Sequence, residues 1–132
     1  MREAEFYSAV YAVIRNPSWD VLFMRRTNSW FKDGYLQLPA WHLEWKETIK
    51  TCCKREIKEE RDIDVSEEDM DVFHVSHRVT SDRVYFDVYV NIKTYEWMLK
   101  LNEPNKCSEL LFVDIYTELF DKFVWYDIEC VK

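Results

Sequence analysis

The sequence predicts an α/β domain in which helices pack on a mixed sheet. Segments rich in aromatic and β-branched residues stand on both sides of one segment with helical periodicity, and a second helix is expected from Thr117 on. The 132 residues match the usual size of one domain, so residues 1–132 are expected to form a single unit. With 48% hydrophobic and 17% aromatic residues, the chain is too apolar to be disordered.

Three strands are expected before the helix. Residues 5–15 and 20–26 are rich in aromatic and β-branched types, and turn residues that begin at Asn16 separate them. This pattern predicts an antiparallel hairpin. A short third strand over residues 35–38 is expected to end at Pro39, because proline lacks the backbone N–H that a central strand needs.

The segment with helical periodicity runs from residue 47 to 61. Apolar residues recur in it every three or four positions, while lysines and glutamates occupy the other positions, so an amphipathic helix is expected, with Thr48 as its amino-terminal cap. The apolar positions are Ile49, Cys52, Cys53 and Ile57.

The second half of the chain predicts more strands. Residues 72–79 and 83–97 alternate apolar and polar side chains around a turn at residues 80–82, which indicates a second hairpin. Residues 110–115 resemble a further strand. The order of strands, helix, strands and helix therefore favours a mixed sheet with helices packed on it.

Net charge, cysteine spacing and the lack of long apolar segments exclude several classes of protein. The formal net charge is −7, so no sequence-independent attraction to nucleic acid or to an anionic membrane is expected, and a polyanionic ligand would need a local cation such as a bound metal. The cysteines show no CxxC spacing, which favours buried thiols over a zinc site or disulfides. No signal peptide or long apolar segment is recognised, and a cytoplasmic location is expected.

Three glutamates of the predicted helix carry the clearest chemical signal. Glu56, Glu59 and Glu60 lie on one side of the helix about one turn apart, where their carboxylates repel one another unless cations intervene. Mg²⁺ and similar hard cations prefer carboxylate oxygens, so this spacing points to a metal site that binds phosphate. An isolated run of this kind could also be a solvated helix face with glutamate–lysine pairs.

The surrounding residues favour the metal site. Residues 41–63 resemble the Nudix box, whose pattern is a glycine, five residues, a glutamate, seven residues, and then Arg-Glu-aliphatic-x-Glu-Glu-x-Gly-aliphatic. Residues 35–39, 42–44 and 102–109 are also similar to segments of family members that cleave nucleoside triphosphates. The resemblance implies the Nudix fold, an α/β/α sandwich with a mixed central sheet. The matches in register are Glu47, Arg55, Glu56, Ile57, Glu59, Glu60 and Ile63.

The resemblance also implies roles for individual residues. Mg²⁺ or Mn²⁺ is expected to bind Glu56, Glu59 and Glu60, together with the backbone carbonyl of Ala40, and to polarise a phosphoryl oxygen and activate water. Arg55 is expected to hold Glu56 in position, and Glu47 to fix the loop before the helix. Candidates for the general base are left open among Glu60, Glu103 and Glu44.

The implied reaction is metal-dependent hydrolysis of a diphosphate linkage in nucleoside triphosphates or related nucleoside diphosphate-linked compounds. The partner is then a nucleotide or another small molecule with a diphosphate, and the chain is expected to be a monomer or a homodimer. His74 and His77 lie three apart in a predicted strand, on opposite faces, which argues against a shared metal site. Five aromatic side chains could stack on a base or could equally belong to core or surface: Tyr7, Trp30, Phe31, Tyr35 and Phe86.

The glycines of the motif are all replaced. Ala40, Trp41, Lys46 and Asp62 occupy positions that are normally glycine, and the whole chain contains one glycine and six tryptophans. Trp41 and Lys46 could fill the loop space where metal and diphosphate would bind, which supports the alternative function given below. Two origins account for this composition, an engineered or redesigned sequence and an unusual natural protein. The alternative function is a catalytically silent scaffold that binds a nucleotide, another small ligand or a protein.

Overall fold

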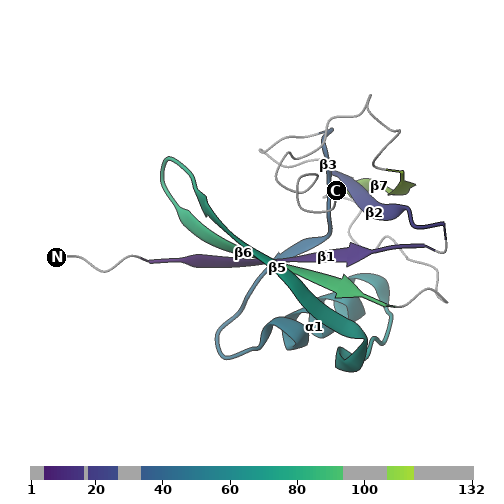
Figure 1. The fold of residues 1–132 in the computed structure, drawn as a ribbon, viewed down its shortest axis with the longest axis horizontal. Helices are drawn as coiled ribbons and strands as arrows, with labels where there is room; N and C mark the ends of the chain where they lie inside the picture. Colours follow the sequence, from purple (N-terminus) through teal and green to yellow (C-terminus); the bar gives the residue numbers. More distant parts are fainter. Residues whose placement is uncertain (1–4, 17, 27–33, 94–106, 115–132) are drawn as a thin grey trace.

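The computed structural model describes residues 5–16, 18–26, 34–93 and 107–114 (Figure 1). The described strands form a four-stranded sheet in the order β4-β1-β6-β5 and a three-stranded sheet in the order β3-β2-β7. A single α-helix and one short 3-10 helix complete the described part. The elements are β1 (Tyr7–Ile14), β2 (Val21–Arg26), β3 (Leu36–Gln37), β4 (Ala40–His42), α1 (Ile49–Arg61), η1 (Glu67–Asp69), β5 (Met70–Val79), β6 (Val84–Ile92) and β7 (Cys107–Val113).

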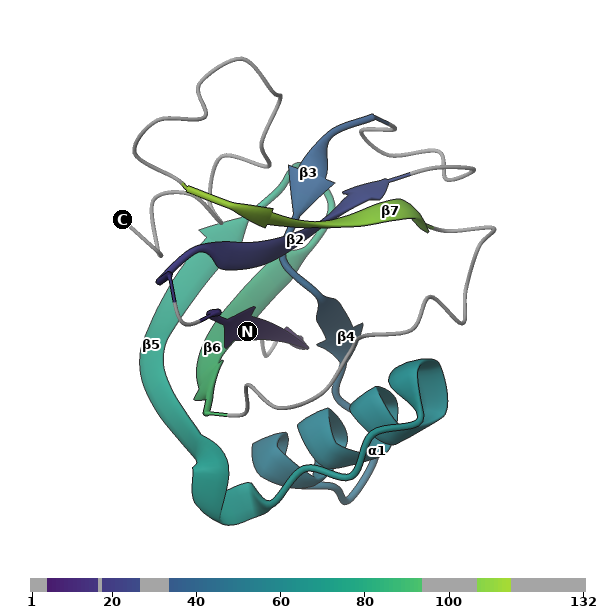
Figure 2. The ribbon, with the colours of Figure 1, turned by 90° about the vertical axis from the view of Figure 1, so that its right-hand side faces the viewer.

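The predicted mixed sheet is confirmed as the four-stranded one. Its central pair β1 and β6 is parallel, whereas β4 and β5 flank that pair in antiparallel orientation. Figure 2 shows three layers, with α1 beneath this sheet and the three-stranded antiparallel sheet on its other face. The second helix, expected from residue 117 on, lies outside the described residues.

The predicted hairpin between residues 5–15 and 20–26 is wrong. β1 and β2 meet only at one antiparallel bridge, between Arg15 and Val21, and then enter different sheets. The reason is the burial of β1 on both of its faces: one set of alternate side chains packs toward α1 and the other toward the three-stranded sheet. A strand buried on both faces belongs in the middle of a sheet, and here β4 and β6 occupy both of its edges.

The third strand is shorter than expected and leads directly into a fourth. β3 ends before Pro39, after which the chain crosses between the sheets and forms β4. The Pro39 carbonyl accepts a hydrogen bond from the Ala12 amide at 2.8 Å, so the crossing is tied to β1. This crossing places β4 beside α1.

The helix is confirmed, with the expected cap. The Thr48 side chain accepts a hydrogen bond from the Thr51 amide at 3.2 Å, and α1 ends at Asp62 in the left-handed conformation. Cys52 and Cys53 are buried free thiols, and burial raises the pKa of each to about 12. None of the helices described is long and apolar enough to cross a membrane.

The second predicted hairpin is also confirmed. β5 and β6 pair antiparallel, with an irregularity between Val72 and His74, and Figure 1 shows this hairpin extending away from the rest of the domain. The strand expected at residues 110–115 is β7, which begins earlier, at Cys107. Residues 94–97, expected to continue the hairpin, lie outside the described residues.

Candidate active site

Arg55 is the centre of the charged residues of α1. Its side chain reaches back to the loop before the helix, where Nε donates to Glu47 Oε2 at 3.1 Å and Nη2 donates to Glu47 Oε1 at 2.9 Å. This paired geometry is the strongest form of contact between arginine and a carboxylate. The Arg55 guanidinium lowers the pKa of Glu47 to about 2, and Glu47 raises the pKa of Arg55 in turn.

Glu47 also organises the loop. Its Oε1 accepts a hydrogen bond from the backbone amide of Glu44 at 2.9 Å. Because Glu47 is ionised and held by Arg55, this contact fixes the turn that leads from β4 into α1. Glu47 therefore contacts both Arg55 and the loop that the resemblance expects it to position.

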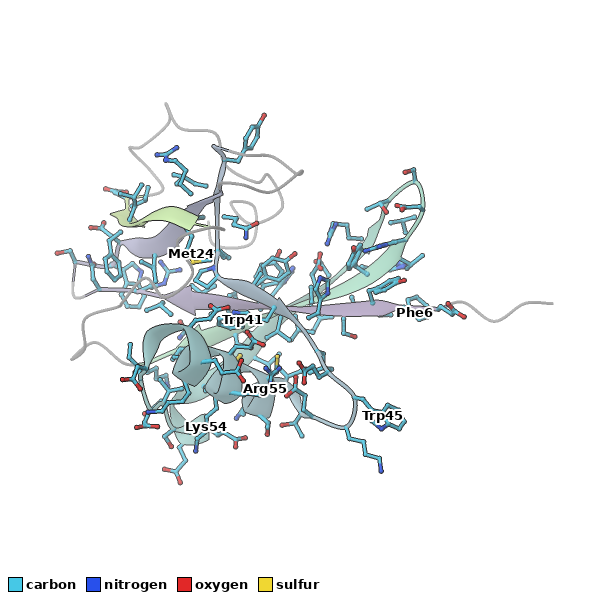
Figure 3. All side chains as sticks on the ribbon, turned by 180° about the vertical axis from the view of Figure 1, so that it is seen from behind. Phe6, Met24, Trp41, Trp45, Lys54 and Arg55 are labelled. Atoms are coloured by element: carbon cyan, nitrogen blue, oxygen red, sulfur yellow. The ribbon has the colours of Figure 1, made fainter. Side chains whose placement is uncertain are left out.

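The same guanidinium contacts two carboxylates of the helix. Arg55 Nη1 donates to Glu56 Oε1 at 2.6 Å and to Glu59 Oε2 at 3.4 Å. Arg55 Nη2 lies 3.6 Å from Glu44 Oε1. One cation therefore partly neutralises four carboxylates, which would repel one another without it. We call Arg55 with Glu44, Glu47, Glu56 and Glu59 the Arg55 cluster; Figure 3 shows Arg55 on the helix.

Glu60 has a different environment. It is only 8% exposed, and its Oε1 accepts a hydrogen bond from the indole Nε1 of Trp41 at 3.0 Å. Trp41 lies in β4 and is also 8% exposed. Its ring belongs to the core cluster that includes Cys52, Cys53 and Ile57 of α1, and Figure 3 shows it between the strand and the helix.

The position of Trp41 corrects an expectation. The sequence suggests that its indole could fill the loop where a metal and a diphosphate would bind, but the residue belongs to a strand and its side chain is in the core. The alternation of side chains along β4 explains this result, because Trp41 pairs with Val10, which also faces α1. No pattern in the sequence indicates the contact with Glu60.

The residues that replace motif glycines behave in two ways. Lys46 and Asp62 have left-handed backbones, with φ of 64° and 56°, so both hold a conformation that favours glycine. Ala40 and Trp41 do not have positive φ. Ala40 instead pairs with Tyr11 as an ordinary strand residue.

The carboxylates do not converge on a metal site in this arrangement. In the ranges that the structure describes, no group of three or more His, Cys, Asp or Glu residues could hold a metal ion. The chemistry of the donors suits a hard cation, but Arg55 contacts Glu56 and Glu59, while Trp41 holds Glu60 toward the core. As arranged here, Glu56, Glu59 and Glu60 do not form a binding site for a divalent metal ion.

The aromatic candidates are not brought together. Tyr7 and Phe86 are both partly exposed, but their β1 and β6 positions alternate, so they face opposite sides of the sheet. Tyr35 precedes β3 in the other sheet. Trp30 and Phe31, and the candidate base Glu103, lie outside the described residues.

The two histidines of β5 have separate neighbours. The His74 ring lies 5.6 Å from that of Tyr89, and the His77 ring lies 5.2 Å from that of Phe86. Since Tyr89 and Phe86 are three apart in β6, the histidines lie on opposite faces of the sheet, as predicted.

A hollow that the sequence did not reveal opens beside the start of β1. Its volume is about 440 Å³. Its walls come from β1, the end of β4 and the β5–β6 turn, which are too far apart in sequence to form a recognisable pattern. The lining residues are Phe6, Tyr7, Ser8, His42, Leu43 and Arg83.

Comparison with known proteins defines the class of this chain. The family model described as NUDIX domain matches residues 5–127, so the protein belongs to the Nudix family. A comparison with curated proteins finds no match. Solved structures with the same fold include the MutT NUDIX hydrolase from Burkholderia pseudomallei, with a TM-score of 0.82 and 16% identity over 96% of each chain.

Two further structures show how widely this fold is shared. The MutT protein from Methanosarcina mazei Go1 has a TM-score of 0.80 and 21% identity, covering 99% of this chain and 94% of that one. The NUDIX domain of Shewanella oneidensis NrtR, solved in complex with ADP ribose, has a TM-score of 0.72 and 10% identity, covering 99% and 86%. At these identities the likeness concerns the fold alone.

Proposed function

We propose that this Nudix protein hydrolyses a diphosphate linkage in nucleoside triphosphates or related nucleoside diphosphate-linked compounds, with Mg²⁺ or Mn²⁺ as its metal. The observation that carries the proposal is the Arg55 cluster. Glu47 holds Arg55 through two hydrogen bonds, and Arg55 holds Glu56 and Glu59 at the surface of α1. A helix that served only as a solvated surface would not need this degree of order among its glutamates.

The proposed roles follow from the positions of the side chains. Glu56 and Glu59 lie nearest to solvent among the three helix glutamates, at 18% and 60% side-chain exposure, and are the first candidates to bind metal. Glu60 and the Ala40 carbonyl complete the proposed ligand set. Glu44 is 66% exposed at the edge of the cluster, which supports its candidacy as general base beside Glu60 and Glu103.

A second function is favoured by one observation. The hydrogen bond between Trp41 and Glu60 keeps one proposed ligand buried, which suits a scaffold that binds a nucleotide or another diphosphate compound without cleaving it. The likeness of fold to a NUDIX domain that was solved with ADP ribose supports this class of ligand. The two functions share a binding site and differ in turnover.

Phosphate and pyrophosphate release over a panel of nucleotides, with Mg²⁺ and with Mn²⁺, tests the proposal. The double variant Glu59→Gln/Glu60→Gln is expected to lose turnover by roughly 100-fold or more, because it removes two proposed ligands. The matched control is Glu67→Gln/Glu68→Gln, two exposed glutamates of η1, which should retain the rate of the unmodified protein. Nucleotide binding by calorimetry without turnover on any substrate would instead establish the second function.

A further inference from the structure

We infer that β5 pairs with β5 of a second copy of this chain, so that two four-stranded sheets join into one across a two-fold axis at His77. Among the described strands, β5 has a neighbour on one edge only, which is β6. Figure 2 shows β5 as the outermost described strand on its side of the sheet. The inference concerns the assembly of the domain and does not depend on the proposed hydrolysis.

The hydrogen bonds of the β5–β6 hairpin determine which backbone groups of β5 point outward. The Thr80 amide donates to the Arg83 carbonyl at 2.8 Å, so these residues form a hydrogen-bonded pair where the hairpin closes. Bonded and non-bonded pairs alternate along antiparallel strands, and the register has no shift from this point back to His74. The outward N–H and C=O groups of β5 are therefore those of its alternate residues, Val75, His77 and Val79.

The side chains of this stretch favour pairing with another strand. Val75 and Val79 are 54% and 65% exposed and lie on the same face of the sheet. Residues 74–79 contain no lysine or proline, two residues that commonly keep an edge strand from pairing. Arg78 carries a charge, but its Nε donates to the buried Asp87 carboxylate at 2.7 Å, so the charge is compensated within the hairpin.

Two-fold symmetry restricts the register. An axis perpendicular to the sheet keeps each face on its own side, so a residue can pair only with a residue that faces the same way. With the axis at His77, Val75 lies opposite Val79 of the second copy, and Ser76 lies opposite Arg78 of the second copy. The outward backbone groups of each strand then meet those of the other. Apolar side chains pair twice, and no like charges are opposed.

The neighbouring register is less favourable. An axis at Ser76 would place His74 opposite Arg78 of the second copy and would separate the valines. Displacement in the other direction runs into the turn at residues 80–82, and displacement toward the start of β5 runs into the irregularity between Val72 and His74. The pairing is therefore confined to residues 74–79, with its centre at His77.

The length of this stretch sets the expected affinity. A pairing of such short strands buries less surface than a standard interface of roughly 800 Å² per partner, so we expect a dissociable dimer with a Kd on the order of 10 µM. Each copy carries a net charge of −7, so added salt should strengthen the dimer by screening the repulsion between copies. Sedimentation velocity over a range of protein concentrations measures the Kd.

Paired charges test the register. Val75→Lys/Val79→Lys places like charges opposite each other twice and should abolish the dimer. Val75→Glu/Val79→Lys places opposite charges in the same two pairs and should restore a Kd within about tenfold of that of the unmodified protein. The control is Val72→Lys, because Val72 is 43% exposed on β5 but lies outside the paired stretch. Circular dichroism checks that each variant is folded.

A cysteine at the axis locates it directly. His77→Cys brings two thiols together across the axis, where the Cα atoms of a hydrogen-bonded pair lie about 5.5 Å apart, within the range of a disulfide. Mild oxidation should then link the two copies, and the unmodified protein, with four cysteines of its own, gives the background. Ser76→Cys should link less well, because its counterpart in the second copy lies diagonally across the axis.

The outcomes decide the inference. A protein that stays monomeric up to about 300 µM, well above the expected Kd, overturns it. A dimer that persists in Val75→Lys/Val79→Lys also overturns it, because that dimer uses another surface. Failure of Val75→Glu/Val79→Lys to restore the dimer, or equal linkage through His77→Cys and Ser76→Cys, rules out the register and with it the inference. None of these measurements involves nucleotide or metal, so their failure leaves the proposed hydrolysis untouched.

Discussion

The two sides of α1 hold their glutamates by different means. On the side away from the sheet, the charged guanidinium of Arg55 contacts four carboxylates. Those of Glu44 and Glu59 are largely exposed, so water can replace these two contacts at small cost. Toward the sheet, the neutral donor Trp41 holds a single buried carboxylate. Ion pairing therefore organises the exposed side of α1, whereas packing of the core organises its buried side.

The largest expected effect comes from the buried side. Trp41→Ala removes a core ring and leaves the buried Glu60 carboxylate without this donor, so we expect the free energy of unfolding to fall by about 3–5 kcal/mol. Urea denaturation followed by far-UV circular dichroism measures the change. The control Trp45→Ala alters an exposed ring of the adjacent loop and should stay within about 0.5 kcal/mol. Equal losses in the two variants would show that the buried contact has no special weight.

On the exposed side the expected effect is smaller and depends on pH. Arg55 lowers the pKa of Glu47 to about 2 from an ordinary value of 4.5, so the ionised form stabilises the folded state. This contribution is fully present above pH 4.5 and is lost as the pH falls toward 2. Glu47→Gln should therefore cost about 1–3 kcal/mol at pH 7 and progressively less in acid.

Stability curves from pH 7 to about pH 2 test this prediction. The difference between Glu47→Gln and the unmodified protein should shrink through the acid range, because protonation removes the same charge that the substitution removes. Glu67→Gln serves as control, since Glu67 is exposed in η1 and lies outside the Arg55 cluster. A difference that does not change with pH would mean that the contact with Arg55 contributes through shape and not through charge.

Periodicity predicted the elements of the fold better than their pairing. The amphipathic spacing of α1 and the alternation in β5 and β6 are local properties, so the sequence alone reveals them. The separation of β1 from β2 depends on which faces are buried by distant segments. Short spacing between two apolar runs therefore suggested a hairpin that the tertiary packing of β1 does not allow.

The candidate site shows the same division. The match of Glu47, Arg55 and the helix glutamates to a fixed spacing predicted which residues would lie together, and the structure places Arg55 among four carboxylates. Trp41 is 19 residues from Glu60 in sequence, and their contact depends on the crossing that places β4 beside α1. No spacing rule reports such a contact, and only the direction of the β4 side chains decides it.

The two sides also differ in backbone conformation, and glycine substitutions that test this difference should change stability least. Lys46, next to Glu47 on the exposed side, has a φ of 64°, whereas Ala40 in β4 has no positive φ. Lys46→Gly should relieve about 1–2 kcal/mol of backbone strain, less the greater chain entropy of glycine and a weak contact of Lys46 Nζ with the Trp45 ring at 5.8 Å. The net gain in stability should be about 0.5 kcal/mol.

The matched variant Ala40→Gly should instead lower the free energy of unfolding by about 0.5–1 kcal/mol, because glycine weakens a strand and no strain is relieved. Opposite shifts in the urea midpoint would show that one glycine position of the motif still requires glycine geometry while the other has become part of the sheet, and shifts of the same sign would contradict this distinction.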